Sequence, residues 1–153
     1  MNKIASFKVD HLNLYPGIYV SRIDEHNGSV VTTFDLRFIT PNKDEVMTTG
    51  AMHTIEHLGA TYLRNSERSD EIIYFGPMGC RTGCYLVMFG KLDSKDVYYL
   101  VKEMCSFIVG YKGEIPGAKK EECGNYLDQD LGKAKEYTER YLREITDNPR
   151  FTY

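Results

Sequence analysis

His53-Thr54-Ile55-Glu56-His57 is the stretch around which the rest of the chain is organised. In a helix, residues four apart lie on one face, so His53 and His57 present two imidazoles to one point, with Glu56 beside them. Two neutral imidazoles at this spacing suit a divalent transition metal, and a carboxylate next to the metal is placed to move protons. The alternative is an amphipathic helix whose histidines are merely solvated.

The residues around this motif predict a helix that begins after Thr48 or Thr49 and runs to Asn65. A threonine hydroxyl caps a helix by accepting a hydrogen bond from a free backbone N–H of the first turn. The apolar residues of this helix share one stripe, formed by Met52, Ile55, Gly59, Tyr62 and Leu63. Both histidines lie beside the stripe, at the edge of a buried face, which is where a half-enclosed metal site has to be.

Length and composition predict one soluble globular domain over residues 1–153, with 42% hydrophobic and 27% charged residues. The net charge of −3 and the pI near 5.8 argue against a nucleic-acid partner. No apolar run approaches the roughly 18 residues of a membrane span, and no apolar signal-peptide region follows Met1. We therefore expect a cytoplasmic protein without a membrane partner, whose thiols stay reduced.

The remaining sequence mixes strands and helices without strict alternation. Strands are predicted at residues 6–14, 18–24, 30–39, 71–75 and 84–89, and Asn27-Gly28 predicts a tight hairpin between the second and third. Further helices are predicted from Asp93 or Ser94 onward and around Leu131 to Ile145. The pattern favours an α+β fold with a mainly antiparallel sheet packed against helices. On the strand at 30–39, Arg37 falls on the face opposite the apolar residues, so it is expected to be solvated unless something covers that face.

The four cysteines fall into different settings. Cys84 begins a strand and Cys105 lies among apolar helical residues, so both are expected to be buried, inert thiols. Cys80 lies in the glycine-rich loop 76–83, whose backbone can approach a ligand closely. Cys123, near a turn before the last helix, is the most plausible third metal ligand. Two histidines and one cysteine with an open fourth position suit a catalytic metal better than a structural one.

Six segments in register resemble the S-ribosylhomocysteine lyase (LuxS) family. They are Phe7-Lys8-Val9-Asp10-His11, Asp35-Leu36-Arg37-Phe38 before Pro41-Asn42, His53 to Leu58, Gly76 to Gly83, Ile115-Pro116-Gly117-Ala118 and Glu122-Cys123-Gly124-Asn125-Tyr126. Each segment alone is weak evidence, but their order and the chain length both match the family. One position departs from it, because Tyr74 stands where other members carry an aspartate, and this affects a detail of substrate contact.

The resemblance implies a metal-dependent lyase that cleaves the thioether of S-ribosylhomocysteine. The products would be homocysteine, which returns to the methyl cycle, and 4,5-dihydroxypentane-2,3-dione, the precursor of the autoinducer-2 signal of quorum sensing. It implies a homodimer with its sites at the interface and one ferrous ion per subunit, with Zn²⁺ or Co²⁺ as substitutes. Ligand type alone would have favoured zinc.

The resemblance also implies a role for each site residue. His53, His57 and Cys123 match the metal ligands, Cys80 and Glu56 match the acid–base pair, and Ser6, His11 and Arg37 match substrate contacts, some of them from the partner subunit. The leaving thiolate must lie β to a carbonyl before it can be eliminated, so the carbonyl has to move along the sugar chain. The metal would act as a Lewis acid in these steps, while Cys80 and Glu56 carry the protons.

Two other functions compete with this one. In an inverzincin-type metalloprotease, which shares the H-x-x-E-H pattern, Glu56 would activate a water molecule on the metal. Such enzymes draw a carboxylate as third ligand and need a larger frame. In a metal-binding regulatory module, Cys123 would instead close a structural site. The open coordination position and the Cys80 loop argue against that module.

Overall fold

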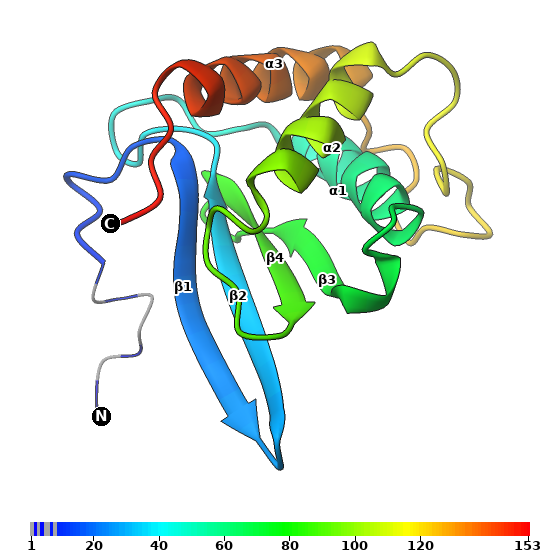
Figure 1. Cartoon of the computed structure of the whole chain (residues 1–153). Helices are drawn as coiled ribbons and strands as arrows, with labels where there is room; N and C mark the ends of the chain where they lie inside the picture. Colours follow the sequence, from blue (N-terminus) through cyan, green and yellow to red (C-terminus); the bar gives the residue numbers. More distant parts are fainter. Residues whose placement is uncertain (1, 3, 5–6, 8) are drawn as a thin grey trace.

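Antiparallel strands in the order β1-β2-β4-β3 form the sheet of the computed structural model, which describes residues 2, 4, 7 and 9–153 (Figure 1). The strands are β1 (Gly17–His26), β2 (Ser29–Arg37), β3 (Ile72–Pro77) and β4 (Gly83–Phe89). The helices α1 (Thr49–Arg64), α2 (Tyr98–Gly110) and α3 (Leu131–Asp147) cover one face of the sheet, and the short 3-10 helix η2 (Ser69–Glu71) leads into β3. The predicted α+β class with an antiparallel sheet is confirmed.

The β1–β2 hairpin turns at the predicted Asn27-Gly28 pair. Both residues have positive φ, 49° and 80°. A tight turn with two left-handed residues matches the twist of the strands, and asparagine and glycine adopt that conformation most readily. The turn pairs His26 with Ser29, and an irregularity between Val20 and Arg22 then shifts the register by one residue, so that Ile18 pairs with Leu36.

Strand β2 is buried on both faces, which the alternation of its residues did not predict. Phe34 and Leu36 point into the core beneath the helices and are fully buried. On the opposite face, Asp35 and Arg37 are only 2% and 3% exposed. The expectation that Arg37 is solvated is wrong, because the Cys80 loop and the C-terminal segment (residues 148–153) cover this face.

Helix α1 begins where its capping residue predicts. The Thr48 hydroxyl accepts a hydrogen bond from the Ala51 N–H at 3.3 Å. The apolar stripe of the helix packs onto β3 and against both other helices, and Gly59 lies directly over the Phe75 ring. Because the buried side of α1 is packed against β3 and the other helices, the edge that carries His53, Glu56 and His57 has a fixed position relative to the sheet.

Two predicted elements differ from the structure. Residues 9–14 form turns rather than the predicted strand, and Ser6 and Lys8 lie outside the described residues. In the turn, the Asp10 carboxylate accepts from the Leu12 N–H at 3.0 Å, a local bond that competes with a strand ladder. Helix α2 begins at Tyr98 instead of near Asp93 for the same reason, since the Asp93 carboxylate accepts from the Lys95 N–H at 2.7 Å and forms a turn.

Cys84 and Cys105 are fully buried in the core, as predicted. Burial raises the pKa of both thiols, because the thiolate form would lose its solvation. Neither thiol is therefore available for chemistry.

Among the described residues, no helix has both the length and the apolar content needed to cross a membrane.

Gly59→Ala should destabilise the protein although alanine is the better helix former. A Cβ at this position would lie 2.4 Å from Cε1 of the Phe75 ring, which is itself buried and has no room to move. The overpacking should lower the free energy of unfolding by about 1–3 kcal/mol, measured by urea denaturation.

Gly132→Ala in α3 is the matched control, because the nearest atom to its Cβ lies at 3.6 Å, an ordinary contact. This variant should be neutral or more stable by about 0.4–1 kcal/mol. Equal effects of the two substitutions would show that the contact between Gly59 and Phe75 does not fix α1.

Candidate metal centre and the Cys80 cavity

Three donor atoms from two distant segments converge at the exposed edge of α1. Nε2 of His53 lies 3.0 Å from Nε2 of His57, and Sγ of Cys123 lies 3.3 Å from Nε2 of His53. All three donor atoms are within 4.8 Å of one another. Ligands bound tetrahedrally at 2.0–2.3 Å are about 3.3–3.8 Å apart. The group is therefore close to the size that one divalent ion requires.

Backbone carbonyls determine which ring nitrogen of each histidine is free. Nδ1 of His53 lies 2.9 Å from the carbonyl oxygen of Asp128, and Nδ1 of His57 lies 2.6 Å from that of Pro116. A carbonyl oxygen only accepts, so each Nδ1 carries the proton and each Nε2 presents a lone pair. Such carbonyl contacts behind the ligands are usual in metal sites, because they fix the tautomer and the ring orientation. The donor set therefore fits a metal ion.

The loop between α2 and α3, which carries Cys123, is fastened to α1 by further bonds. The Thr54 hydroxyl donates to the Gln129 side chain at 2.8 Å and accepts from the Asp130 N–H at 3.0 Å. At the other end of the loop, Gly117 has φ +72° and its Cα abuts the His57 ring, where a Cβ would lie 3.2 Å from Nδ1. Glycine is required there because the backbone is left-handed and close to the ring.

Glu56 lies on the same edge of α1 as the two histidines. It lines an open cavity of about 410 Å³ together with His53, His57, Pro116 and Gly117. Its side chain is half-buried and belongs to no salt bridge found in the described part of the chain. The carboxylate is therefore free to exchange protons with a small molecule in this cavity.

Cys80 lies on a different part of the molecule, across the sheet from the helices. The register of β2 with β4 pairs Arg37 with Gly83, and this brings the loop that carries Cys80 beside Arg37. Gly83 is needed at that point, because a Cβ would lie 2.3 Å from the backbone oxygen of Leu36. As a result Nη1 of Arg37 lies 3.9 Å from Sγ of Cys80.

Thr82 connects the guanidinium to the thiol. Its hydroxyl accepts a short hydrogen bond from Nη1 of Arg37 and lies 3.1 Å from Sγ of Cys80. Because the hydroxyl oxygen already accepts from Arg37, its own hydrogen is free to donate to sulfur. A cation and a hydroxyl donor therefore both lie beside the sulfur atom of Cys80.

A buried carboxylate holds Arg37 from the other side. Oδ2 of Asp35 pairs with Nη2 of Arg37 at 2.5 Å, and both side chains are at most 4% exposed. Burial raises the pKa of Asp35, while the Arg37 guanidinium opposes that rise. Buried charges persist in proteins when they are paired, so each side chain here depends on the other.

The predicted substrate contacts partly surround this second cavity. Its volume is about 230 Å³, and its lining includes Phe7, His11, Arg37, Cys80 and Tyr153. Ser6, the third predicted contact, lies outside the described residues. His11 is oriented by its own segment, since its Nδ1 lies 2.8 Å from the Val9 carbonyl oxygen.

The structure thus divides the predicted site residues into two groups. His53, Glu56, His57 and Cys123 lie together at the α1 edge, and Cys80, Arg37 and His11 lie together on the open face of the sheet. Among the described residues, the two cavities share no lining residue.

Sequence reasoning missed three residues at the second cavity: Asp35 and Tyr153, which line it, and Thr82, whose hydroxyl lies beside Cys80. Opposite charges two apart on a strand, as in Asp35 and Arg37, could have indicated a buried pair. Nothing local to Thr82 or Tyr153 marks them.

Tyr74, the residue that departs from the family pattern, lies on β3 and lines a further cavity together with Tyr85 and Val87. Its side chain is 47% exposed, and its hydroxyl covers Gly76 where a Cβ would otherwise lie. Burial and, to a smaller extent, the charge of Glu56 raise the pKa of its phenol. The tyrosine therefore lies within electrostatic reach of the Glu56 carboxylate.

Comparison with known proteins identifies one family. The model of the family S-Ribosylhomocysteinase (LuxS) matches residues 4–151. A protein of Finegoldia magna named S-ribosylhomocysteine lyase is 55% identical over 147 residues, which cover 96% of this chain and 94% of the relative. Proteins of the same name from Clostridium acetobutylicum and Phocaeicola vulgatus are 52% and 51% identical over 97% of this chain and over 94% and 92% of their own lengths.

Cys123→Ala should lower the metal content of the purified protein, because it removes one of three donor atoms that converge on one point. Cys80→Ala is the matched control. It also removes one thiol, but from the other cavity, and should keep the metal stoichiometry of the wild type. Elemental analysis after gel filtration measures both. Metal loss from Cys80→Ala together with retention by Cys123→Ala would reverse the two roles.

Proposed function

The chain belongs to the S-Ribosylhomocysteinase (LuxS) family, and we propose that it is an S-ribosylhomocysteine lyase whose single domain spans residues 1–153. It would cleave the carbon–sulfur bond of S-ribosylhomocysteine to homocysteine and 4,5-dihydroxypentane-2,3-dione. The observation that carries the proposal is the convergence of His53, His57 and Cys123 beside the free carboxylate of Glu56.

The reaction needs proton carriers rather than an external reagent. The two products together contain all the atoms of the substrate, so neither water nor an oxidant is consumed. Each time the carbonyl shifts by one position, one carbon loses a proton, its neighbour gains one, and a hydroxyl proton moves between their oxygens. After two shifts, loss of the proton from the carbon between the carbonyl and the sulfur-bearing carbon lets the C–S bond break. The thiolate leaves with its electron pair and takes up a proton, and the enol that remains becomes the dione when its hydroxyl proton moves to carbon. A divalent ion held by His53, His57 and Cys123 would supply Lewis acidity toward the substrate carbonyl.

Glu56 is suited to the proton transfers on the metal side. It shares its cavity with His53 and His57, so it can reach the carbon and oxygen atoms of a sugar chain bound there. Because successive carbons lose and regain protons, one carboxylate that both accepts and donates can serve more than one step.

Cys80 is suited to carry protons on the opposite side of the substrate. The Arg37 guanidinium and the Thr82 hydroxyl lie beside its sulfur atom, and the thiolate is the basic form of this side chain. Arg37 and His11 both line the cavity that contains Cys80, so both residues can bind hydroxyl groups of the sugar. The site needs two cysteines that are not oxidised, and a reducing cytoplasm would keep them so. The proposed metal is a ferrous ion, with Zn²⁺ or Co²⁺ as substitutes.

The two groups of site residues would meet across the interface of a homodimer. Within one chain they occupy separate cavities, yet the chemistry needs Cys80 and Glu56 on one substrate. Large apolar side chains remain exposed at both places: Phe7 at the Cys80 cavity, and Tyr126 and Leu127 just after Cys123, with Phe7 70% and Leu127 77% exposed. Exposed apolar groups of this size mark surfaces that associate. A partner subunit would cover them and exclude water from the reacting sugar.

The activity is tested by incubating metal-loaded protein with S-ribosylhomocysteine and titrating free thiol. The wild type should release one thiol per substrate consumed. Glu56→Gln keeps the shape and the metal but removes the base, so turnover should fall by roughly two to four orders of magnitude. Near-normal turnover of this variant would exclude Glu56 from the mechanism. Peptide hydrolysis without thiol release by the wild type would instead support a metalloprotease.

The shared site is tested by mixing two inactive variants, Cys80→Ala and Cys123→Ala. Sedimentation should first give twice the 17.6 kDa chain mass. After subunit exchange, roughly a quarter of the wild-type activity should return, because about half of the dimers are mixed and each has one complete site. Cys80→Ala mixed with Glu56→Gln should behave alike. A mixture of Cys123→Ala with Glu56→Gln is the matched control and should stay inactive, because both changes fall in the same half of the site. No recovery in the first mixture would place Cys80 and the metal ligands in one subunit.

A further inference from the structure

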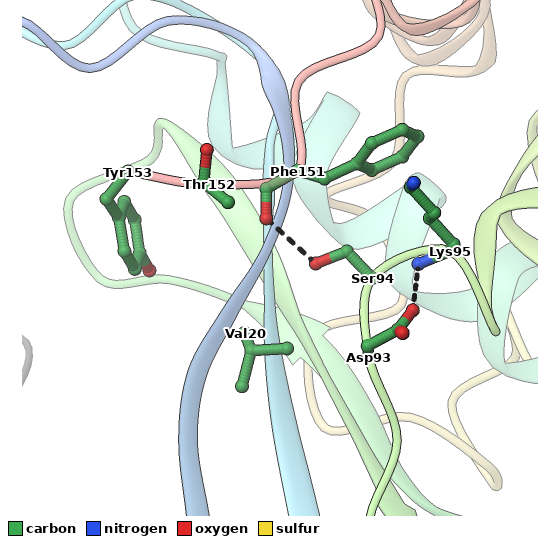
Figure 2. Close-up of a pocket in the computed structure, with 7 residues that line it drawn as sticks. All are labelled: Val20, Asp93, Ser94, Lys95, Phe151, Thr152 and Tyr153. Carbon is green, nitrogen blue, oxygen red and sulfur yellow. Dashed lines mark hydrogen bonds between the residues drawn. The ribbon is translucent and has the colours of Figure 1, made fainter.

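The C-terminal segment is anchored along β1 by bonds that do not involve the predicted site. The Ile18 N–H donates to the Arg150 carbonyl oxygen at 3.0 Å. The Ser94 hydroxyl, 3% exposed as a residue, donates to the Phe151 carbonyl oxygen at 3.2 Å (Figure 2). The Phe151 ring meets the Tyr98 ring edge-on, with centroids 5.5 Å apart. The backbone at 150–151 is therefore held at defined points, and the residues that follow reach the open face of the sheet.

Tyr153 is delivered by this segment to the buried ion pair. Its ring stacks on Tyr19, with centroids 4.7 Å apart and an interplanar angle of 16°. Its hydroxyl donates to Oδ2 of Asp35 at 3.1 Å. The same side chain forms part of the wall of two cavities, the one of about 230 Å³ that contains Cys80 and a second of about 480 Å³ lined by Val20, Ser94 and Phe151 (Figure 2).

The carboxylate that Tyr153 contacts has few other restraints. Oδ2 of Asp35 accepts from both Tyr153 and Nη2 of Arg37. Its second oxygen, Oδ1, and Nε of Arg37 are buried and have no hydrogen-bond partner among the described residues. The orientation of the carboxylate therefore depends on the two donors at one oxygen, of which only Tyr153 lies outside the ion pair.

We propose that Tyr153 is a positioning residue for the lyase, which acts through Asp35 to hold the Arg37 guanidinium at the correct distance from Cys80 and from the substrate. This inference rests on the proposed function, in which Arg37 binds the substrate and Cys80 carries protons. The family match ends at residue 151, so it assigns nothing to this tyrosine.

The proposed action follows a continuous series of contacts. The Tyr153 hydroxyl fixes Oδ2 of Asp35, that oxygen holds Nη2 of Arg37, and Nη1 of the same guanidinium lies 3.9 Å from Sγ of Cys80. The guanidinium group is planar and rigid, so a rotation of the group that displaces Nη2 also displaces Nη1. Burial and the Asp35 charge raise the pKa of the Tyr153 phenol, which keeps its hydroxyl protonated as a donor.

Tyr153→Phe tests the proposal, because it removes the hydroxyl and keeps the ring on Tyr19. Loss of one hydrogen bond to a charged group should raise KM for S-ribosylhomocysteine roughly 3- to 10-fold, with kcat changed less than KM. Without substrate, alkylation of Cys80 by iodoacetamide, followed by peptide mass spectrometry on the metal-loaded protein, should slow by a factor of about 2–5.

Tyr19→Phe is the matched control. It removes a hydroxyl from the other member of the same stack, but that hydroxyl donates to the Tyr15 carbonyl oxygen at 2.8 Å and does not reach Asp35. Both variants should lose similar thermal stability, while Tyr19→Phe should keep KM and the alkylation rate of the wild type. A merely structural role of Tyr153 would affect the two variants alike.

Two results would overturn the positioning role: a KM and alkylation rate of Tyr153→Phe equal to those of the wild type, or equal changes in Tyr19→Phe. Failure of the proposed function gives a different result, because the wild type itself would then release no thiol. In that case the alkylation rates, which need no substrate, still decide whether Tyr153 controls the surroundings of Cys80.

Discussion

Nε2 of His53, Nε2 of His57 and Sγ of Cys123 lie within 4.8 Å of one another, so that a divalent ion between them would be held by all three atoms. Nε2 atoms 3.0 Å apart, each deprotonated because Nδ1 donates to a carbonyl, repel one another unless a cation lies between them. The surrounding structure supports this arrangement. Helix α1 presents the histidines one turn apart, and bonds from Thr54 fasten the Cys123 loop against the helix.

The proposed proton carrier Cys80 is positioned by a different part of the chain. The β2–β4 register places the Cys80 loop beside Arg37, and Thr82 connects the guanidinium with sulfur. Asp35 and Arg37 lie on the sheet face that usually meets water, and the C-terminal segment helps to bury them. Helix α1 and the Cys123 loop thus hold the predicted metal ligands, the loop between β3 and β4 holds Cys80, and the proposed homodimer would bring the two groups onto one substrate.

Local patterns in the sequence predicted much of this structure, and long-range contacts account for what they missed. The turn at Asn27-Gly28, the Thr48 cap and the spacing of His53 and His57 are encoded within a few residues, and all three appear as predicted. Cys123 was assigned as third ligand from its setting, and the structure brings it to the histidines from 70 residues away. The burial of Arg37 was missed because it depends on residues 45 and 116 positions later, Thr82 and Tyr153. The start of α2 was predicted too early because the Asp93 carboxylate forms a turn. Helix propensity alone does not show whether such a turn or a helix forms at this point.

We propose that two imidazoles and one thiolate of this chain bind a single divalent ion and leave one coordination position open. X-ray absorption at the zinc edge of the zinc-loaded protein tests this coordination most directly. The spectrum should show one sulfur at about 2.3 Å and two imidazole nitrogens at about 2.0–2.1 Å, with one further light atom completing the shell. A first shell without sulfur, or with two sulfurs, would contradict it.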